Sequence, residues 1–195
     1  MATADSTALA PQSRVDLARL ATLWSESSPA LTLRVVEPMR VLSLRHLQAE
    51  GARALNTVLA AHALPMLAQP GRFCGIESML IWRSPDEALL LTQDDARAAA
   101  LLAALQPAPG ALACALDLSS GMLVVKLQGS GVGALLSRLV DAQALPREAG
   151  QGSRMRLADI AAIVWREAPD RVGLLVDRAN EHHLARWLSY AADAV

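Results

Sequence analysis

One glycine-rich run in the sequence has the residue types that can cradle a phosphate group. Residues 129–133 read Gly-Ser-Gly-Val-Gly between an apolar strand-like stretch and a helix-like stretch, and the first turn of a helix offers free amide groups to an anion. The spacing differs from the G-x-G-x-x-G of dinucleotide-binding proteins, and the sheet expected around it is antiparallel rather than parallel. We interpret the run as a strand-to-helix turn that requires small residues.

The four histidines do not form a metal-ligand pattern. His182 and His183 are adjacent, and neighbours on a helix point about 100° apart, whereas two ligands on one helix need an i, i+4 spacing. His46 and His62 are isolated, without a carboxylate or thiol partner close in the sequence. The sequence therefore predicts no metal site, and we interpret the adjacent pair as solvent or interface residues.

The residues that could act as nucleophiles or acid–base pairs are better explained by structural roles. Ser-Ser-Gly at 119–121 lacks the G-x-S-x-G elbow of a nucleophilic serine. The adjacent carboxylates at 86–87 and 94–95 fall where a turn and a helix cap account for acidic residues. Cys74 and Cys114 lie in apolar surroundings outside any CxxC spacing, which favours reduced, buried thiols. The sequence predicts no catalytic, cofactor-binding or metal-binding residue on this chain.

The composition bounds the class of protein. The chain has 195 residues, of which 53% are hydrophobic and 19% charged, with a net charge of −1, so it can bury a full core and offers no basic face to nucleic acid. No apolar run approaches the roughly 18 residues that span a bilayer, and the first ten residues lack the pattern of a signal peptide. We expect a cytoplasmic protein that binds neither nucleic acid nor membrane. Lys126 is the only lysine, which a nucleotide-composition bias would explain.

An internal repeat organises the chain. Residues 78–92 read as two strands turned around Ser-Pro-Asp-Glu at 84–87, and residues 161–177 repeat the Trp-Arg, Pro-Asp, charged residue and Leu-Leu in the same order. The remaining periodicities predict strands at 31–36 and 39–46, a helix at 52–62, a helix at 96–105, a hairpin at 112–128 turned at 119–121, a helix around 135–140, and a last helix from 178 capped by Asp177.

These elements predict a duplicated α+β fold. Each half reads strand-strand-helix-strand-strand-helix with mostly antiparallel sheets, and the pseudo-repeats are 31–106 and 111–195 within one domain at 31–195. Residues 1–30 are rich in Ala, Ser and Thr and read as an N-terminal arm with one short helix at most, at 13–24. Such an arm is either frayed or laid across a partner, and the sequence leaves these alternatives open.

The order of motifs resembles the gamma subunits of heterotetrameric sarcosine oxidases. Arg-His at 45–46, Ala-Glu-Gly at 49–51, Trp-Arg-Ser-Pro-Asp-Glu-Ala-Leu-Leu-Leu at 82–91 and Asp-Leu-Ser at 117–119 carry the resemblance. It implies a fold like the folate-binding domain of aminomethyltransferases. It also implies a complex that oxidises sarcosine or a related secondary N-methyl amine and passes one carbon to tetrahydrofolate. The longer Ala-rich start and Ala88, where relatives have an aromatic residue, leave the amine open.

The resemblance also implies where the cofactors lie. It places FAD, FMN, NAD, tetrahydrofolate and zinc on partners: a large alpha subunit that binds folate and NAD, a flavin-binding beta subunit and a small zinc-binding delta subunit. This chain would then be a non-catalytic structural subunit, with Arg14, Arg19 and Trp24 as interface candidates because Arg and Trp are enriched at binding hot spots. The alternative is a stand-alone folate-binding or aminomethyltransferase-like protein, in which Asp117 would hold the pterin ring rather than cap a turn.

Overall fold

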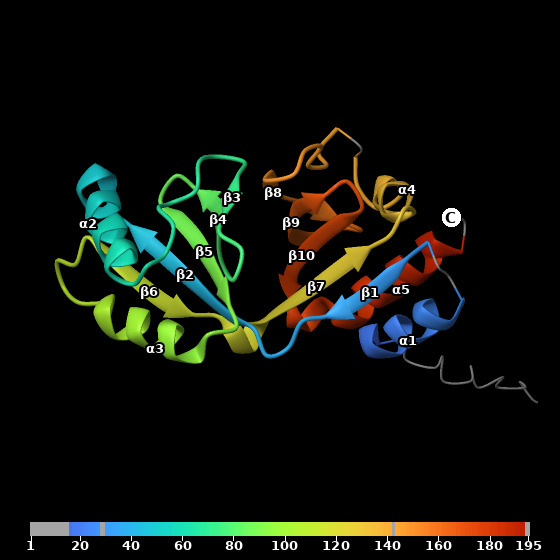
Figure 1. The fold of residues 1–195 in the computed structure, drawn as a ribbon, viewed down its shortest axis with the longest axis horizontal. Coiled ribbons are helices and arrows are strands. Elements are labelled where there is room, and N and C mark those ends of the chain that lie inside the picture. Colours follow the sequence, from blue (N-terminus) through green and yellow to red (C-terminus); the bar gives the residue numbers. More distant parts are fainter. Residues whose placement is uncertain (1–15, 28–29, 142, 194–195) are drawn as a thin grey trace, which may run out of the picture.

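The protein is built from two five-stranded antiparallel sheets that face each other, with helices on both outer faces (Figure 1). A computed structural model describes residues 16–27, 30–141 and 143–193. The elements in chain order are α1 (Leu17–Ser27), β1 (Thr32–Val35), β2 (Arg40–His46), α2 (Gln48–Ala61), β3 (Phe73–Cys74), β4 (Ser78–Ser84), β5 (Glu87–Thr92), α3 (Asp95–Ala104), β6 (Ala113–Asp117), η1 (Ser119–Gly121), β7 (Met122–Gln128), α4 (Val132–Ser137), β8 (Gly152–Leu157), β9 (Ile160–Ala168), β10 (Arg171–Asp177), η2 (Arg178–Asn180) and α5 (Glu181–Ala192).

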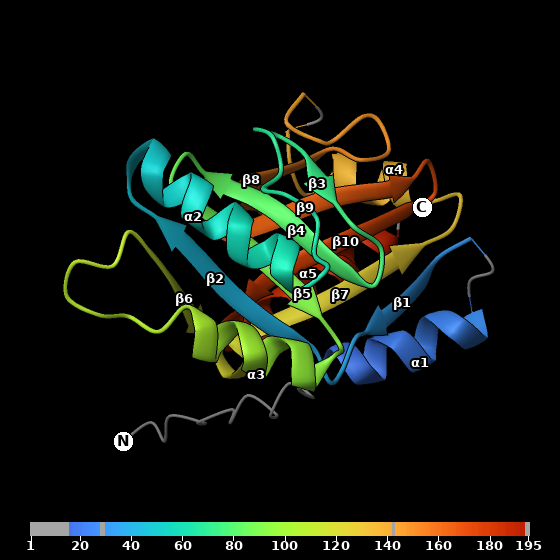
Figure 2. The ribbon, with the colours of Figure 1, turned by 60° about the vertical axis from the view of Figure 1, so that its left-hand side comes forward.

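Each sheet and its helices form a lobe. The first lobe has the strand order β3-β4-β5-β2-β6 and carries α2 and α3, while the second has the order β1-β7-β10-β9-β8 and carries α1, α4 and α5. Figure 2, with the first lobe forward, shows α2 and α3 in front of their strands and the second-lobe sheet behind. Both predicted Trp-Arg hairpins are present, as β4-β5 and β9-β10.

The two halves of the chain exchange their first strands. The half from β1 to α3 and the half from β6 to α5 have the same order of elements, β-β-α-β-β-β-α, and equivalent strands take equivalent places in the two sheets. However, β1 pairs with β7 of the second lobe, and β6 pairs with β2 of the first. The duplicated α+β prediction is confirmed, but each half has one strand more than the predicted strand-strand-helix-strand-strand-helix unit, namely β3 and β8. The predicted repeats, 31–106 and 111–195, each contribute one strand to the sheet of the other lobe.

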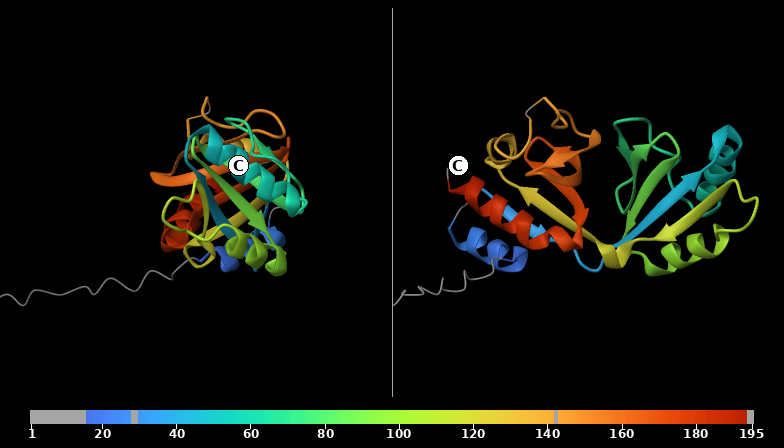
Figure 3. Two further views of the ribbon diagram at one scale, coloured as in Figure 1. Left: turned by 90° about the vertical axis from the view of Figure 1, so that its left-hand side faces the viewer. Right: turned by 180° about the vertical axis from the view of Figure 1, so that it is seen from behind.

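The exchange makes the predicted hairpin at 112–128 wrong. Its two strands, β6 and β7, lie in different sheets, and the turn η1 carries the chain from one lobe to the other. Figure 3 shows, from behind, how the sheets splay apart from this crossing. Alternating apolar residues determine which face of a strand is buried, but they do not determine which strand lies beside it. A local turn signal between two such strands was therefore misread as a hairpin.

Three apolar cores hold the layers together. One lies between the first-lobe sheet and its helices, and a second between the second-lobe sheet and α1, α4 and α5. The third lies between the two sheets, and its most fully buried side chains are those of Val41, Ile81, Leu89, Trp165 and Leu175. Away from the crossing the lobes touch again, where Phe73 donates its backbone N–H to Gly150 O at 3.1 Å and Arg72 bridges to Gln151.

Helix α1 corrects the interface prediction for Trp24. Leu17, Leu20 and Trp24 recur at i, i+3 and i+7 and are 0%, 1% and 5% exposed in the core of the second lobe. An amphipathic helix buries this stripe against a sheet, so Trp24 is a core residue of its own chain. Arg19 is exposed on the opposite side of α1. Arg14 lies outside the residues that the structure describes.

Two local predictions change at the helix ends. The helix expected to begin after Gly51 begins at Gln48, and Gly51 lies within α2, where a Cβ would come 2.2 Å from Leu112 O. Asp177 was expected to cap the last helix, but its side chain makes no cap hydrogen bond, and the turn η2 precedes α5. Within the described part of the chain, no helix has the length and apolar character needed to cross a bilayer.

Candidate functional site

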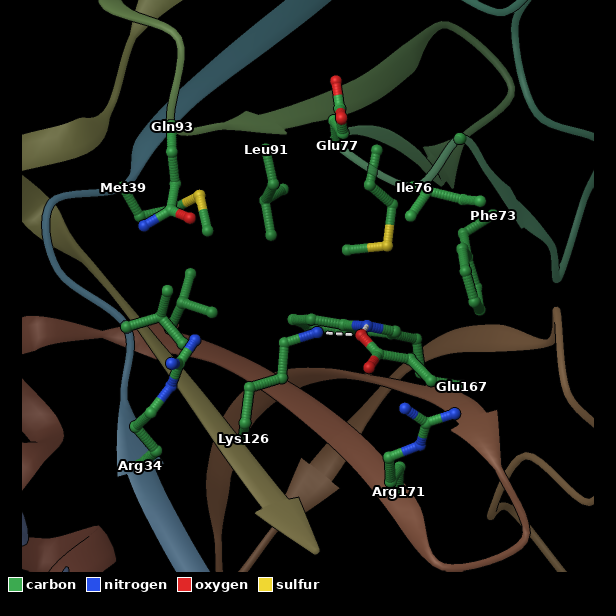
Figure 4. Close-up of a pocket in the computed structure, with 15 residues that line it drawn as sticks. Arg34, Met39, Phe73, Ile76, Glu77, Leu91, Gln93, Lys126, Glu167 and Arg171 are labelled. Atoms are coloured by element: carbon green, nitrogen blue, oxygen red, sulfur yellow. Dashed lines mark hydrogen bonds and ion pairs between the residues drawn. The ribbon is translucent and has the colours of Figure 1, made fainter.

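A cleft opens between the two sheets beside their shared core. It has a volume of about 460 Å³, which is within the range of small-molecule sites. Figure 4 shows its two unlike walls: the second-lobe sheet presents charged side chains, and the first lobe faces them with a mainly apolar surface. The described lining residues are Arg34, Val36, Met39, Phe73, Gly75, Ile76, Glu77, Met79, Leu91, Gln93, Val124, Lys126, Trp165, Glu167 and Arg171.

The charged wall is built from one row of residues across four strands. Arg34 on β1 lies opposite Lys126 on β7, Lys126 lies opposite Gly173 on β10, and Gly173 lies opposite Trp165 on β9. Directly opposed residues in an antiparallel sheet project from the same face. A Cβ on Gly173 would come 2.1 Å from the Trp165 ring, so the glycine leaves the space in which the indole lies across β10 toward Lys126.

Glu167 joins the lysine and the tryptophan. Its Oε1 accepts a hydrogen bond from Trp165 Nε1 at 2.9 Å and a second one, within an ion pair, from the Lys126 ammonium group. Lys126 Nζ also lies 4.9 Å from the centroid of the Trp165 ring, which is within the range of a cation–π contact. The indole is fully buried, so the position of the ammonium group is fixed by a rigid surface and a carboxylate.

Positive charge is concentrated on this wall. Burial, followed by the positive charges of Arg34 and Arg171, lowers the pKa of Lys126 to about 8. Among the described residues, neither Arg34 nor Arg171 donates a side-chain hydrogen bond or forms an ion pair. Glu167 on the same wall and Glu77 on the opposite wall are the acidic residues of the described lining. The cleft thus holds three cationic and two acidic side chains.

The cleft is suited to binding rather than to nucleophilic catalysis. Its described lining contains no Ser, Thr, Cys or His, and the amine of Lys126 is engaged by Glu167. No three His, Cys, Asp or Glu side chains of the described residues come together as metal ligands. What the arrangement can do is hold an anionic group on cationic side chains while an apolar body rests on the other wall.

The glycine-rich run at 129–133 is a tight structural turn, as predicted. Gly129 has a φ of 128°, and a Cβ there would come 2.1 Å from Ala30 O. The amides of Gly129 and Gly131 donate to the backbone carbonyls of Asp170 and Ala30. These amides are therefore taken up by the protein, and the run does not line the cleft.

Asp117 is a turn-capping residue and lies outside the described lining of the cleft. Its Oδ1 accepts hydrogen bonds from the Ser119 amide at 2.8 Å and the Ser119 hydroxyl at 2.5 Å. Burial by itself would raise the pKa of Asp117, but these hydrogen bonds and the charge of Arg40 outweigh it and lower the pKa. The alternative prediction required Asp117 to hold a pterin ring, but Oδ1 of its carboxylate already accepts two hydrogen bonds from Ser119.

The other residues singled out in the sequence are also dispersed. Asp94 caps α3 by accepting from the Arg97 amide at 2.9 Å, and Asp86 accepts from the Ser84 hydroxyl in its turn. His183 contacts Ala158 O at 2.6 Å. Cys74 and Cys114 are free thiols of intermediate burial, and burial raises the pKa of Cys74. None of these residues belongs to the described lining of the cleft.

Sequence reasoning missed the residues that form the cleft. Arg34, Glu167 and Arg171 were not singled out, and Lys126 was attributed to composition. One signal was present: Lys126 is the sole lysine, and it interrupts the otherwise apolar run Leu-Val-Val-Lys-Leu at 123–127. A charge in the middle of a buried strand is uncommon unless it is paired, so it was the position to examine.

The fold defines the class of protein. No protein-family model matches the chain. The aminomethyltransferase T of the glycine cleavage system from Bartonella henselae superposes with a TM-score of 0.57 and 18% identity, covering 87% of this chain and 48% of that one. This likeness shows the fold alone: a duplicated α+β fold of the aminomethyltransferase type, as predicted.

Closer relatives narrow the class to one family. A chain of the heterotetrameric sarcosine oxidase from Corynebacterium sp. U-96, solved with pyrrole 2-carboxylate, superposes with a TM-score of 0.76 and 27% identity over 93% of this chain and 96% of that one. The sarcosine oxidase subunit gamma of the same strain is 30% identical over 167 residues, 82% of this chain and 78% of the relative. That of strain P-1 is 31% identical over 112 residues, 56% and 54% of the two chains. The chain belongs to the sarcosine oxidase gamma subunit family.

Proposed function

We propose that this chain is a non-catalytic subunit of a heterotetrameric sarcosine oxidase-type complex. The observation that carries the proposal is the superposition on a chain of heterotetrameric sarcosine oxidase, which leaves little of either chain unmatched. In this role the chain belongs to an oxidoreductase that acts on sarcosine or a related secondary N-methyl amine and transfers the one-carbon unit to tetrahydrofolate. A cytoplasmic location is part of the same proposal.

We further infer how the work is divided among subunits. The partners are an alpha subunit that binds folate and NAD, a beta subunit that binds flavin and a small delta subunit that binds zinc. FAD, FMN, NAD, tetrahydrofolate and zinc are then held by those partners. Family membership supports this division, and the described lining of the inter-sheet cleft contains no Ser, Thr, Cys or His.

The contact surface with the partners is best placed on α5. Trp187 is 38% exposed and Tyr190 is 66% exposed, and their rings meet edge to face with centroids 5.9 Å apart. Large aromatic side chains at the surface are enriched at binding hot spots. Helix α1, with exposed Leu23 and Arg19, packs beside α5. This aromatic ridge, Trp187 and Tyr190, replaces buried Trp24 as the expected anchor.

Co-expression tests the assembly. The tagged chain would be produced together with the flavin-containing subunits of the same organism and purified through its tag. We expect flavin absorbance to co-elute with the chain in one peak of size-exclusion chromatography. The double substitution Trp187→Ser and Tyr190→Ser should remove the co-eluting flavin because it removes the aromatic anchors.

An exposed arginine elsewhere supplies the control. Arg138 follows α4 and is exposed, so Arg138→Ser should leave the flavin peak unchanged. A chain that always elutes alone, with no flavoprotein recovered, would contradict the assembly. Loss of the flavin peak in the Arg138 variant as well would instead contradict the placement of the contact on α5.

A further inference from the structure

The two walls of the inter-sheet cleft differ in chemistry. Arg34, Lys126 and Arg171 all come from the second-lobe sheet, on β1, β7 and β10. The facing wall is made by first-lobe side chains such as Phe73, Ile76 and Leu91, with the polar Gln93 and Glu77 beside them (Figure 4). A ligand placed here would meet cations on one side and apolar surface on the other.

The cationic wall is not neutralised by the protein. Glu167 pairs with Lys126, but Arg34 and Arg171 have no ion-pair or hydrogen-bond partner among the described residues. Their charges act on Lys126 strongly enough to lower its pKa, together with burial. Gathering like charges costs free energy, and a bound anion would remove this cost. Other arginines of the chain, such as Arg83 and Arg40, do have carboxylate partners.

The aromatic floor of the cleft is preorganised. Trp165 is fully buried, its N–H is held by Glu167, and the absence of a side chain at Gly173 gives the indole its place. The buried ring and Glu167 hold the Lys126 ammonium group in place, so little conformational entropy is lost when an anion binds to it. The size of the cleft, about 460 Å³, suits a small molecule rather than a peptide.

We propose that the inter-sheet cleft binds a small organic anion, whose carboxylate or phosphate group lies on Arg34, Lys126 and Arg171 and whose apolar body lies against the accessible first-lobe wall at Phe73 and Ile76. No covalent step is involved. The proposal concerns this chain alone and does not rest on its assembly with partner subunits. It therefore stands or falls separately from the function proposed above.

Calorimetry on the isolated full chain provides the first test. The probes are naphthoate and naphthyl phosphate, which share one apolar body, with naphthylmethanol as the uncharged analogue and inorganic phosphate as the anion alone. We expect saturable binding of at least one anionic probe, at least about tenfold tighter than naphthylmethanol and than inorganic phosphate, since charge-assisted hydrogen bonds and apolar burial both contribute. The tighter of the two anions identifies the class of head group.

A double substitution supplies the second test. Arg34 and Arg171 are exposed at the rim, so the Arg34→Gln, Arg171→Gln chain should fold, which its melting temperature and near-ultraviolet circular dichroism would verify. We expect this chain to bind the anionic probe at least about tenfold more weakly and to bind naphthylmethanol unchanged. The matched control is Arg138→Gln, which removes an exposed arginine outside the cleft and should change neither affinity.

Three results would overturn the proposal. The first is the absence of saturable binding for both anionic probes at millimolar concentration. The second is equal affinity for the anionic probes and naphthylmethanol, because binding would then not use the cationic wall. The third is anion binding that persists in the Arg34→Gln, Arg171→Gln chain but is lost after Trp187→Ala, which would place the probe on the aromatic ridge of α5.

Discussion

The inner faces of the two lobes carry related polar clusters, but only in the first lobe does each arginine of the described cluster have a carboxylate partner. In the first lobe, Glu87 is 13% exposed and accepts from Arg83 Nη1 at 2.8 Å and from the buried hydroxyl of Ser43 at 2.5 Å, with Arg45 at 3.5 Å. In the second lobe, Glu167 holds Lys126 and Trp165, while Arg34 and Arg171 have no ion-pair partner in the described part of the chain. The hollow beside Arg83 measures about 80 Å³ against about 460 Å³ for the cleft.

The two tryptophans of the repeated hairpins show how this difference arises. Trp165 is fully buried on the inner face of its sheet, in the core between the sheets. Trp82 is half-buried and alternates with Ile81, which lies in that same core, so Trp82 points to the opposite face. The repeated phrase thus keeps the same cross-strand pair, with each Trp opposite the residue before Leu-Leu, but places its Trp on opposite faces in the two lobes. In one lobe the indole becomes the floor of a cleft, and in the other it lies on the side of the helices.

The largest difference expected between the lobes concerns their first helices. The second lobe is covered by α1, α4 and α5, whereas the described part of the first lobe is covered by α2 and α3, the equivalents of α4 and α5. Deleting residues 1–30 should unfold the second lobe, because it removes Leu17, Leu20 and Trp24, each worth about 2–5 kcal/mol, from a total stability of about 5–15 kcal/mol. Urea unfolding followed by circular dichroism measures this. A truncated chain that unfolds cooperatively at the urea midpoint of the full chain would contradict a stabilising role of α1 in the second lobe.

The next largest effect separates the two tryptophans. Trp165→Ala should lower the free energy of unfolding by about 3–5 kcal/mol, the usual cost of removing a fully buried Trp. Trp82→Ala should cost less than about half as much because its ring is partly in water. Urea midpoints of the two variants provide the comparison. Equal losses of unfolding free energy would mean that the two indoles contribute equally to stability although they lie on opposite faces of their sheets.

A smaller effect is expected at the residue opposite each tryptophan, Gly173 and Ala88. Gly173→Ala should cost about 2 kcal/mol, because its new methyl group would overlap the Trp165 ring. In the Trp165→Ala background the same change should be nearly neutral, since the ring is gone. In the first lobe, Ala88→Gly should cost about 1 kcal/mol, and this loss should be independent of Trp82. Additive losses at Gly173 and Trp165 would contradict the contact.

The smallest effect is a pH dependence confined to the second lobe. The pKa of Lys126 is about 8 in the folded chain and 10.5 ordinarily, so between these values the unfolded chain binds more protons and wild-type stability should rise with pH. From about pH 7 to 9 we expect a gain of about 1 kcal/mol relative to Lys126→Met, in which this titration is absent. Urea midpoints at both pH values test it, and parallel changes in the two chains would exclude this role of Lys126.

The sequence was sufficient for most of the elements and for their duplication because both depend on local signals, but strands β3 and β8 were not predicted. The two Trp-Arg hairpins have Pro-Asp turns within them, and the helices have apolar stripes, so their positions could be predicted to within a few residues. The strand exchange could not be predicted in this way. Strands β1 and β6 pair with partners about ninety and seventy residues away, and nothing in their alternation distinguishes those partners from their neighbours in sequence.

The cleft was harder to predict than the fold for the same reason. Its row of Arg34, Lys126, Gly173 and Trp165 comes from four strands, and β1, which carries Arg34, joins the row only through the exchange. Trp165 lies on the face of its sheet that meets the other sheet, and the missing side chain of Gly173 leaves the space for its ring. Sequence patterns locate side chains along a strand, but the meeting of side chains across a sheet depends on pairing.

The reciprocal exchange of β1 and β6 bears on how such a chain could have originated. A polypeptide holding only one half would leave its own sheet without an edge strand and its first strand without a partner. Two copies could satisfy each other through a two-fold axis, as swapped homodimers do at low cost. Joining two such copies end to end would then allow one of them to diverge. In the present chain, the inner face of the first lobe is closed by its own ion pairs, and that of the second lobe is open to a ligand.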